Sequence, residues 1–236
     1  MTNDALSDAL DGARRRLADA LSDAGRPPDD ARLLAVSKTQ PATAVRCAHA
    51  LGQRHFGENY LQEALDKQAE LADLDDIVWH FIGPLQSNKT RTVAERFDWM
   101  HSVDRLKVAR RLSRQRPEGM PPLNICLQVN VSREASKSGV MPAELDALAR
   151  QVAALPGLSL RGLMAIPAPA ETFDAQRRPL AELRACLHNL QTALPDAPLD
   201  TLSMGMSGDL EAAIAEGATL VRLGTAIFGA RQRFVQ

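Results

Sequence analysis

Short apolar runs alternate with helical patterns along almost the whole chain, and this alternation is the feature that most constrains the fold. Eight runs have the length and composition of buried strands, and a helical pattern follows each of them. They are residues 33–39, 54–57, 78–82, 99–103, 124–130, 159–166, 201–204 and 219–224. Because the chain has 236 residues, this repetition predicts an α/β protein with one domain over residues 1–236, a (β/α)8 TIM barrel.

An open, doubly wound sheet is the alternative arrangement for such a chain. That fold would place a GxGxxG turn after its first strand to bind a dinucleotide, and no such motif follows residues 33–39. No Ser/Gly-rich linker or change in composition divides the chain. A helical pattern over residues 4–21 precedes the first strand and stops before Gly25, Pro27 and Pro28. We therefore expect a barrel with an extra N-terminal helix.

The charge balance argues against nucleic acid as a partner. Lys and Arg total 28 against 29 for Asp and Glu, so no net field attracts the chain to a polyanion or to an anionic membrane surface. No apolar run reaches the roughly 20 residues that a membrane helix needs. The first residues of the chain are acidic and amphipathic, unlike a secretory signal, which is basic and then apolar. We expect a cytoplasmic protein.

Lys38 stands near the end of the first predicted strand, in the segment LLAVSKT. Burying an unpaired ammonium group is costly, so this lysine is expected at the carboxyl end of the strand, where barrels bind their ligands. Partial desolvation there favours the neutral, nucleophilic amine that Schiff-base chemistry requires. The alternative is a strand-end lysine that extends into solvent.

The loops after the seventh and eighth predicted strands have the composition of a phosphate site. The first contains Gly205, Ser207 and Gly208, and the second contains Gly224 and Thr225. Glycines allow a close approach of the backbone, helix N-termini favour anions, and barrels frequently bind phosphate after strands seven and eight. Each loop alone is more simply an N-cap with a turn glycine. Their occurrence together favours the phosphate site.

Several other polar residues near strand ends allow two interpretations. Arg222 alternates with apolar neighbours, so it points into the barrel or toward its mouth, where it either binds a ligand or pairs with a buried carboxylate. Glu58 is expected to cap its own helix, and Asn59 either does the same or binds a ligand. His80 and His101 lie on predicted strands and are expected in the core or behind the site. No spacing of potential ligands resembles a metal site.

Five local motifs carry a resemblance to a known family. They are AVSK at 35–38, FGENY at 56–60, WHFIGPLQSNK at 79–89, LSMGMS at 202–207 and VRLGTAIFG at 221–229. Together they resemble the pyridoxal phosphate homeostasis protein family, whose members are fold-type III barrels related to the N-terminal domain of alanine racemase. The resemblance extends from about residue 33 to residue 231, and the set of motifs is highly specific.

The resemblance implies pyridoxal 5′-phosphate as the cofactor and a role for each site residue. Lys38 would hold the cofactor as an internal aldimine, Asn59 would contact its ring, and Arg222 would face the pyridine nitrogen. The phosphate would be bound by Ser207, Gly224 and Thr225. A guanidinium only donates hydrogen bonds, so it suits an unprotonated ring nitrogen and leaves the cofactor a poor electron sink.

The expected function is therefore cofactor homeostasis rather than catalysis. The protein would hold, buffer or deliver pyridoxal phosphate, with dependent apoenzymes as candidate recipients, and would affect amino-acid and keto-acid balance indirectly. A small amino-acid racemase or lyase is the alternative, and a barrel that binds another phosphorylated metabolite without covalent attachment is the third.

Alanine racemases add an all-β domain and use a tyrosine as the opposing base. Here the chain ends soon after Phe228, and its single tyrosine, Tyr60, is expected to be packed. Without the domain that builds racemase dimers, we expect a monomer.

Overall fold

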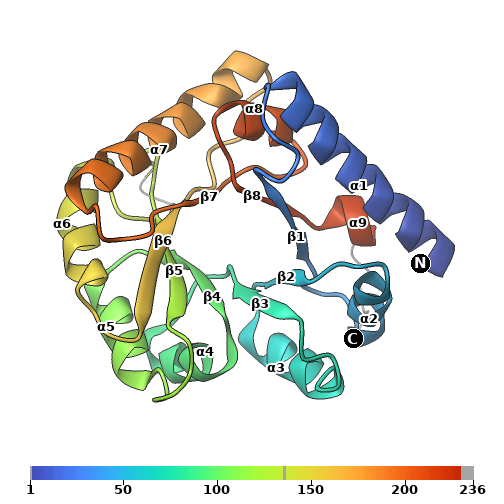
Figure 1. Ribbon diagram of the computed structural model, residues 1–236, viewed down its shortest axis with the longest axis horizontal. Helices are drawn as coiled ribbons and strands as arrows, with labels where there is room; N and C mark the ends of the chain where they lie inside the picture. Colours follow the sequence, from blue (N-terminus) through green and yellow to red (C-terminus); the bar gives the residue numbers. More distant parts are fainter. Residues whose placement is uncertain (1, 135–136, 230–236) are drawn as a thin grey trace.

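The computed structural model describes residues 2–134 and 137–229. Within this part of the chain, eight parallel strands are hydrogen-bonded in chain order, and β8 pairs with β1 to close a barrel (Figure 1). The strands are β1 (Arg32–Val36), β2 (His55–Glu58), β3 (Val78–Phe81), β4 (Trp99–Val103), β5 (Leu123–Gln128), β6 (Leu158–Met164), β7 (Thr201–Ser203) and β8 (Leu220–Leu223). The predicted TIM barrel is confirmed, and each predicted strand overlaps an observed one.

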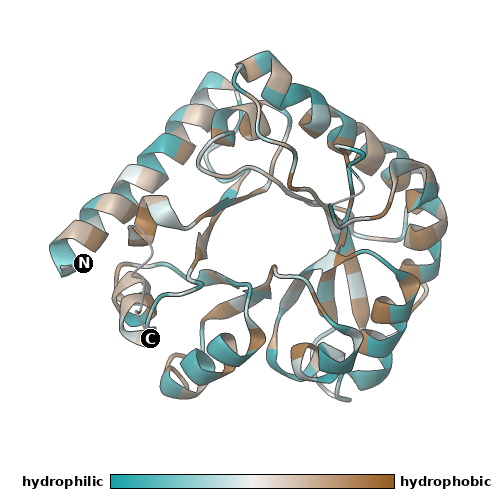
Figure 2. Cartoon of the chain, turned by 180° about the vertical axis from the view of Figure 1, so that it is seen from behind, coloured by the Kyte–Doolittle hydropathy of each residue, from teal (hydrophilic) through white to brown (hydrophobic). Residues whose placement is uncertain are grey.

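Helices surround the barrel on its outside. They are α1 (Asn3–Asp23), α2 (Ala42–Ala50), α3 (Leu61–Glu70), α4 (Thr90–Arg96), α5 (Leu106–Gln115), α6 (Pro142–Ala153), α7 (Phe173–Ala193), α8 (Leu210–Ala215) and α9 (Thr225–Phe228). A 3-10 turn, η1 (Ser87–Lys89), precedes α4. Hydrophilic and hydrophobic residues alternate along these helices, as expected when one face covers the sheet (Figure 2). In the ranges that the structure describes, no helix has the length and hydropathy needed to cross a membrane.

The additional N-terminal helix, α1, lies along the outer side of the barrel. Thr2 caps it, because the hydroxyl of this residue accepts a hydrogen bond from the backbone N–H of Ala5. One stripe of the helix is buried, and it contains Leu6, Leu10, Leu17 and Leu21. This stripe faces α8 and α9, so α1 covers the last two strand-helix units (Figure 1).

Strand side chains alternate between two environments. Those that point outward, such as Leu33 and Phe56, pack under the helices in the main hydrophobic core. A separate, much smaller apolar cluster lies on the inner face, and it consists of Trp99, Cys126 and Met164. Barrel interiors are usually filled by layers of branched apolar side chains. The small size of this inner cluster leaves space in the barrel for polar residues.

The strand register assigns these polar residues to the inner face. Leu34 of β1 lies opposite Arg222 of β8, and Val36 lies opposite Gly57 of β2. Gly57 in turn lies opposite His80 of β3. Residues in register on adjacent strands share a face, so Arg222 and His80 both point into the barrel. This placement confirms the inward direction that the alternation of Arg222 with apolar neighbours predicted.

Candidate functional site

The carboxyl ends of all eight strands meet at one mouth of the barrel, and the predicted site residues lie at that mouth. Lys38 follows the end of β1 by two positions, and Asn59 directly follows β2. Ser207 lies in the loop between β7 and α8. Gly224 and Thr225 lie at the junction of β8 and α9. Residues far apart in the sequence are thereby brought to one end of the molecule.

The segment that carries Lys38 is held in place by its neighbour Ser37, which is fully buried. The Ser37 hydroxyl donates a hydrogen bond of 2.6 Å to Oε1 of Glu58. The Ser37 carbonyl accepts one of 2.6 Å from Nζ of Lys67, and its backbone N–H donates to the carbonyl of Gly57. Three hydrogen bonds therefore fix the backbone next to Lys38.

A buried ion pair between β2 and α3 supports this arrangement. Nζ of Lys67 lies 2.8 Å from Oε1 of Glu58 and 2.6 Å from Oε1 of Glu63. Burial raises the pKa of the Glu58 carboxyl, while Lys67 and the Ser37 hydroxyl act in the opposite direction. The expectation that Glu58 caps its own helix is wrong, because its side chain is occupied by Lys67 and Ser37 and α3 has no side-chain cap.

We predict that Lys67→Met lowers the free energy of unfolding by about 3 kcal/mol, because it leaves the Glu58 carboxyl buried without its cation. Urea unfolding followed by circular dichroism measures the change. Adding Glu58→Gln to this variant should restore part of the loss, since a neutral amide costs less to bury.

The matched control is Lys107→Met, on the exposed face of α5, which should change the free energy of unfolding by less than about 0.5 kcal/mol. Equal effects of the two substitutions would contradict a special role for the buried pair.

Arg222 is buried inside the barrel and is held by two neutral acceptors. Its Nη1 donates to the hydroxyl oxygen of Ser203 at 2.9 Å, and its Nη2 donates to the carbonyl of Ala165 at 2.9 Å. Burial lowers the pKa of Arg222 to about 10, so the guanidinium stays charged at neutral pH. Within residues 2–134 and 137–229 it has no carboxylate partner, so the alternative of a buried ion pair is wrong. Its remaining N–H groups are available to a ligand.

Two histidines on the inner face lie behind Arg222, which is one of the two positions that the sequence left open for them. His80 and His101 are completely buried. Burial, followed by the charge of Arg222, lowers the pKa of His101 to about 3. Burial, followed by the neighbouring His101, His55 and Arg32, lowers the pKa of His80 well below its usual value. Both rings are therefore neutral at neutral pH. Among the described residues, no group of three potential ligands could hold a metal ion.

The two buried histidines predict a loss of stability in mild acid. The unfolded chain takes up protons below a pKa of 6.5, whereas folded His101 resists protonation down to a pKa of about 3. The free energy of unfolding should therefore fall as the pH drops below about 6.5, by about 1.4 kcal/mol per pH unit for each buried histidine.

His101→Gln should remove the contribution of one histidine, about 1.4 kcal/mol per pH unit, from the slope of the free energy of unfolding against pH. Urea unfolding between about pH 6 and pH 5 measures this slope. If the variant and the original protein had the same slope, protonation of His101 would be excluded as a cause.

The two loops expected to bind phosphate differ in how they are built. Gly224 precedes α9 and lies close to β1, because a Cβ at this position would be 3.2 Å from the carbonyl oxygen of Val36. Thr225 is the first residue of α9. Ser207 is exposed, and its carbonyl accepts a hydrogen bond of 2.9 Å from Nη1 of Arg16 on α1. Sequence reasoning missed Arg16, because nothing local shows that α1 reaches this loop.

Ser207 does not cap the helix that follows it. The helix α8 begins at Leu210, and Asp209 occupies its N-cap position. The carboxylate of Asp209 accepts a hydrogen bond from the backbone N–H of Met206 instead. Ser207 is thus not the N-cap residue of α8.

Two asparagines at the same mouth have unused hydrogen-bonding capacity. The side-chain oxygens of Asn59 and Asn130 are buried and have no partner among the described residues. The backbone carbonyl of Asn59 packs against Gly83, since a Cβ at position 83 would be only 2.1 Å from this oxygen. Buried polar atoms are normally paired, so these amides fit a site that receives a polar ligand.

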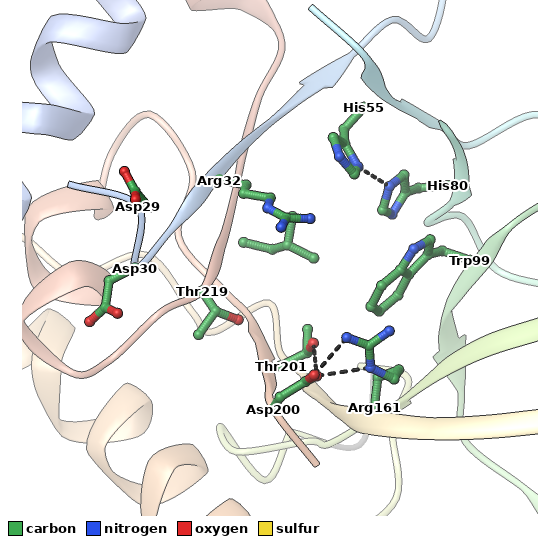
Figure 3. Close-up of a pocket in the computed structure, with 11 residues that line it drawn as sticks. Asp29, Asp30, Arg32, His55, His80, Trp99, Arg161, Asp200, Thr201 and Thr219 are labelled. Atoms are coloured by element: carbon green, nitrogen blue, oxygen red, sulfur yellow. Dashed lines mark hydrogen bonds and ion pairs between the residues drawn. The ribbon is translucent and has the colours of Figure 1, made fainter. Parts of the chain in front are cut away.

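A cavity of about 280 Å³ lies at the opposite end of the barrel (Figure 3). Its lining includes Arg32, His55, Trp99 and Leu220, which are the first residues of their strands, so this is the N-terminal mouth. Barrel enzymes place their chemistry at the other mouth. This cavity is therefore separate from the site around Lys38.

The barrel has a lysine after β1 and an arginine on β8 that points into its interior. The family model of the alanine racemase N-terminal domain matches residues 10–232, and this domain is the class to which the chain belongs. Within that class, the chain belongs to the pyridoxal phosphate homeostasis protein family. It is 66% identical to the pyridoxal phosphate homeostasis protein of Pseudomonas aeruginosa over 216 residues, which are 92% of this chain and 91% of that protein. The pyridoxal phosphate homeostasis protein of Escherichia coli is 54% identical over 220 residues, which are 92% of this chain and 93% of that protein.

Solved structures agree with this assignment. The structure of PipY from Synechococcus elongatus without PLP is 44% identical in sequence and has a TM-score of 0.86. The match covers 95% of this chain and the whole PipY chain. The PipY structure with PLP bound has a TM-score of 0.80 and covers 90% of this chain and all of its own. Alanine racemase from Corynebacterium glutamicum is 17% identical, with a TM-score of 0.70 over 99% of this chain and 63% of its own. That last likeness shows a shared fold alone.

Proposed function

We propose that this chain binds pyridoxal phosphate covalently through Lys38 and serves to hold, buffer and deliver the cofactor. The observation that carries the proposal is the position of Lys38 at the barrel mouth that also contains the loop of Gly224 and Thr225, with Arg222 inside. The same cofactor is bound in the PipY structure, whose sequence is 44% identical.

The residues at this mouth suit the separate parts of the cofactor. When bound, pyridoxal phosphate supplies an aldehyde that reacts reversibly with primary amines, and Lys38 is the amine that would hold it. The start of α9, with Gly224 and Thr225, would receive the phosphate together with Ser207. The unused amide of Asn59 would contact the ring.

Arg222 makes a carrier more plausible than a strong catalyst. Its guanidinium is charged and can only donate hydrogen bonds, so it suits an unprotonated ring nitrogen. A ring held in that state withdraws electrons weakly, which disfavours the carbanion chemistry of amino-acid enzymes. The site would therefore retain the cofactor without activating it fully.

We predict that Lys38→Ala abolishes the visible absorbance of protein incubated with pyridoxal phosphate and the adduct that borohydride makes permanent. Peptide mapping of the reduced protein should place the label on Lys38. Lys89→Ala, at an exposed position after β3, is the control and should retain both signals.

A Lys38→Ala variant that still carried covalently bound cofactor would contradict the proposed attachment. An unmodified protein that stayed colourless and released its ligand on dialysis would favour the third hypothesis, a barrel for another phosphorylated metabolite.

A small racemase or lyase is the second candidate function, and the shared fold of alanine racemase favours it. A two-base racemase needs a second base opposite the lysine. The single tyrosine, Tyr60, was expected to be packed, but it is 52% exposed at the start of α3. It is the N-cap residue of α3, where its side chain makes no capping hydrogen bond.

We predict no exchange of the α-hydrogen of amino acids above the background of free pyridoxal phosphate. Incubation of the loaded protein with a panel of amino acids in deuterated water, followed by mass spectrometry, measures this exchange. Exchange that depends on Lys38 would instead assign the chain to the racemase or lyase class.

In this proposal the protein acts as one monomeric domain that transfers cofactor to dependent apoenzymes. The single closed barrel supports the first part, because the lysine, the arginine and the phosphate loops all belong to it. Apoenzyme recipients remain part of the proposal and follow from the reversible attachment that Lys38 would provide.

A further inference from the structure

A continuous line of hydrogen bonds crosses the interior of the barrel. Nδ1 of His55 lies 2.9 Å from Nε2 of His80, and Nδ1 of His80 lies 2.9 Å from Nε2 of His101. Nδ1 of His101 lies 2.8 Å from Oγ of Ser203, which also accepts from Arg222 at 2.9 Å. The line begins at the cavity of the N-terminal mouth, where Figure 3 shows His55 bonded to His80, and it ends at Arg222.

The arginine gives this line a direction. A guanidinium has no acceptor, so Arg222 donates to Ser203. Ser203 is completely buried, and its own hydroxyl hydrogen also needs an acceptor. Nδ1 of His101 is the acceptor within reach, so Ser203 donates to it and His101 carries its hydrogen on Nε2.

The same reasoning applies to the two remaining rings. His101 donates from Nε2 to Nδ1 of His80, which must then carry its hydrogen on Nε2. His80 donates in turn to Nδ1 of His55. All three rings therefore have the same neutral tautomer, and every hydrogen bond in the line points away from Arg222. The low pKa values of the buried His80 and His101 agree with neutral rings.

His55 is the histidine of this line that solvent protons can reach, because it borders the cavity. Its ring is only partly buried, and the cavity that it borders also contains charged side chains, namely Arg32, Asp29, Asp30, Arg161 and Asp200. Burial and the charge of Arg32 lower the pKa of His55, so that its Nδ1 remains an acceptor near neutral pH. Protonation would place a hydrogen on that nitrogen and leave the buried N–H of His80 without an acceptor.

We propose that His55, His80, His101 and Ser203 are positioning residues that hold Arg222 as a hydrogen-bond donor to the cofactor ring. The proposal rests on the proposed function in one respect, namely that Arg222 faces the ring nitrogen. It adds that the orientation of Arg222 depends on a directional chain that reaches the far mouth of the barrel.

The direction of the chain can be measured without cofactor. Long-range proton-nitrogen NMR spectra of the unmodified apoprotein distinguish the two neutral tautomers of each histidine. We expect hydrogen on Nε2 in His55, His80 and His101 at neutral pH. Hydrogen on Nδ1 of His101 would overturn the proposal, whatever the protein binds.

The effect on the site is measured with the loaded protein. Ser203→Ala removes the link between Arg222 and His101, and we expect about tenfold weaker retention of pyridoxal phosphate, the equivalent of one hydrogen bond. We also expect a shifted visible absorbance maximum. Ser203→Thr keeps a hydroxyl and should restore both, whereas a merely structural role would not require the hydroxyl. His188→Gln, at an exposed position on α7, is the control.

Unchanged retention and absorbance in Ser203→Ala would overturn the proposal. Failure of the proposed function has a different signature, because an unmodified protein that takes up no cofactor would lack the Lys38 adduct. The NMR measurement on the apoprotein would still decide the direction of the chain in that case.

Discussion

The buried charge of Arg222 is the constraint on which the interior of the barrel depends. Its pKa of about 10 leaves it charged at neutral pH, and a guanidinium offers only donors, so the groups around it must accept. Ser203 and the carbonyl of Ala165 do so. The serine then needs an acceptor of its own, which explains a histidine at position 101. Hydrogen-bonded polar side chains therefore occupy part of the interior, where most barrels have apolar side chains.

A second buried cation, Lys67, lies on the outer side of the barrel, next to the end of β1. Arg222 lies inside the barrel beside Leu34 of β1, whereas Lys67 lies outside and binds the carbonyl of Ser37 just beyond that strand. The carboxylate of Glu58 neutralises Lys67 and also accepts from Ser37. The residue after β1 is thus held from the outer side of the barrel, by Lys67 and Glu58. The proposed attachment at Lys38 would benefit from this support, because a fixed backbone limits the positions of the amine.

The two mouths of the barrel differ in the residues that they carry. The carboxyl ends of the strands carry Lys38, Asn59 and the loop of Gly224, which is the usual division of labour in this fold. The amino ends form a cavity whose His55 begins the hydrogen-bond line toward Arg222. The line of hydrogen bonds thus connects the cavity at the amino ends with the arginine in the interior of the barrel.

The sequence by itself determined the barrel, its strand order and the positions of Lys38 and Arg222, because these depend on local periodicity and on where each strand ends. It also indicated that His80 and His101 lie on strands, either in the core or behind the site. Only the tertiary structure showed that Lys67 reaches Glu58 and Ser37, that Arg16 binds the loop of Ser207, and that the histidines form one line with Ser203. Those contacts join residues up to 191 positions apart, and their geometry depends on barrel closure, which no local pattern encodes.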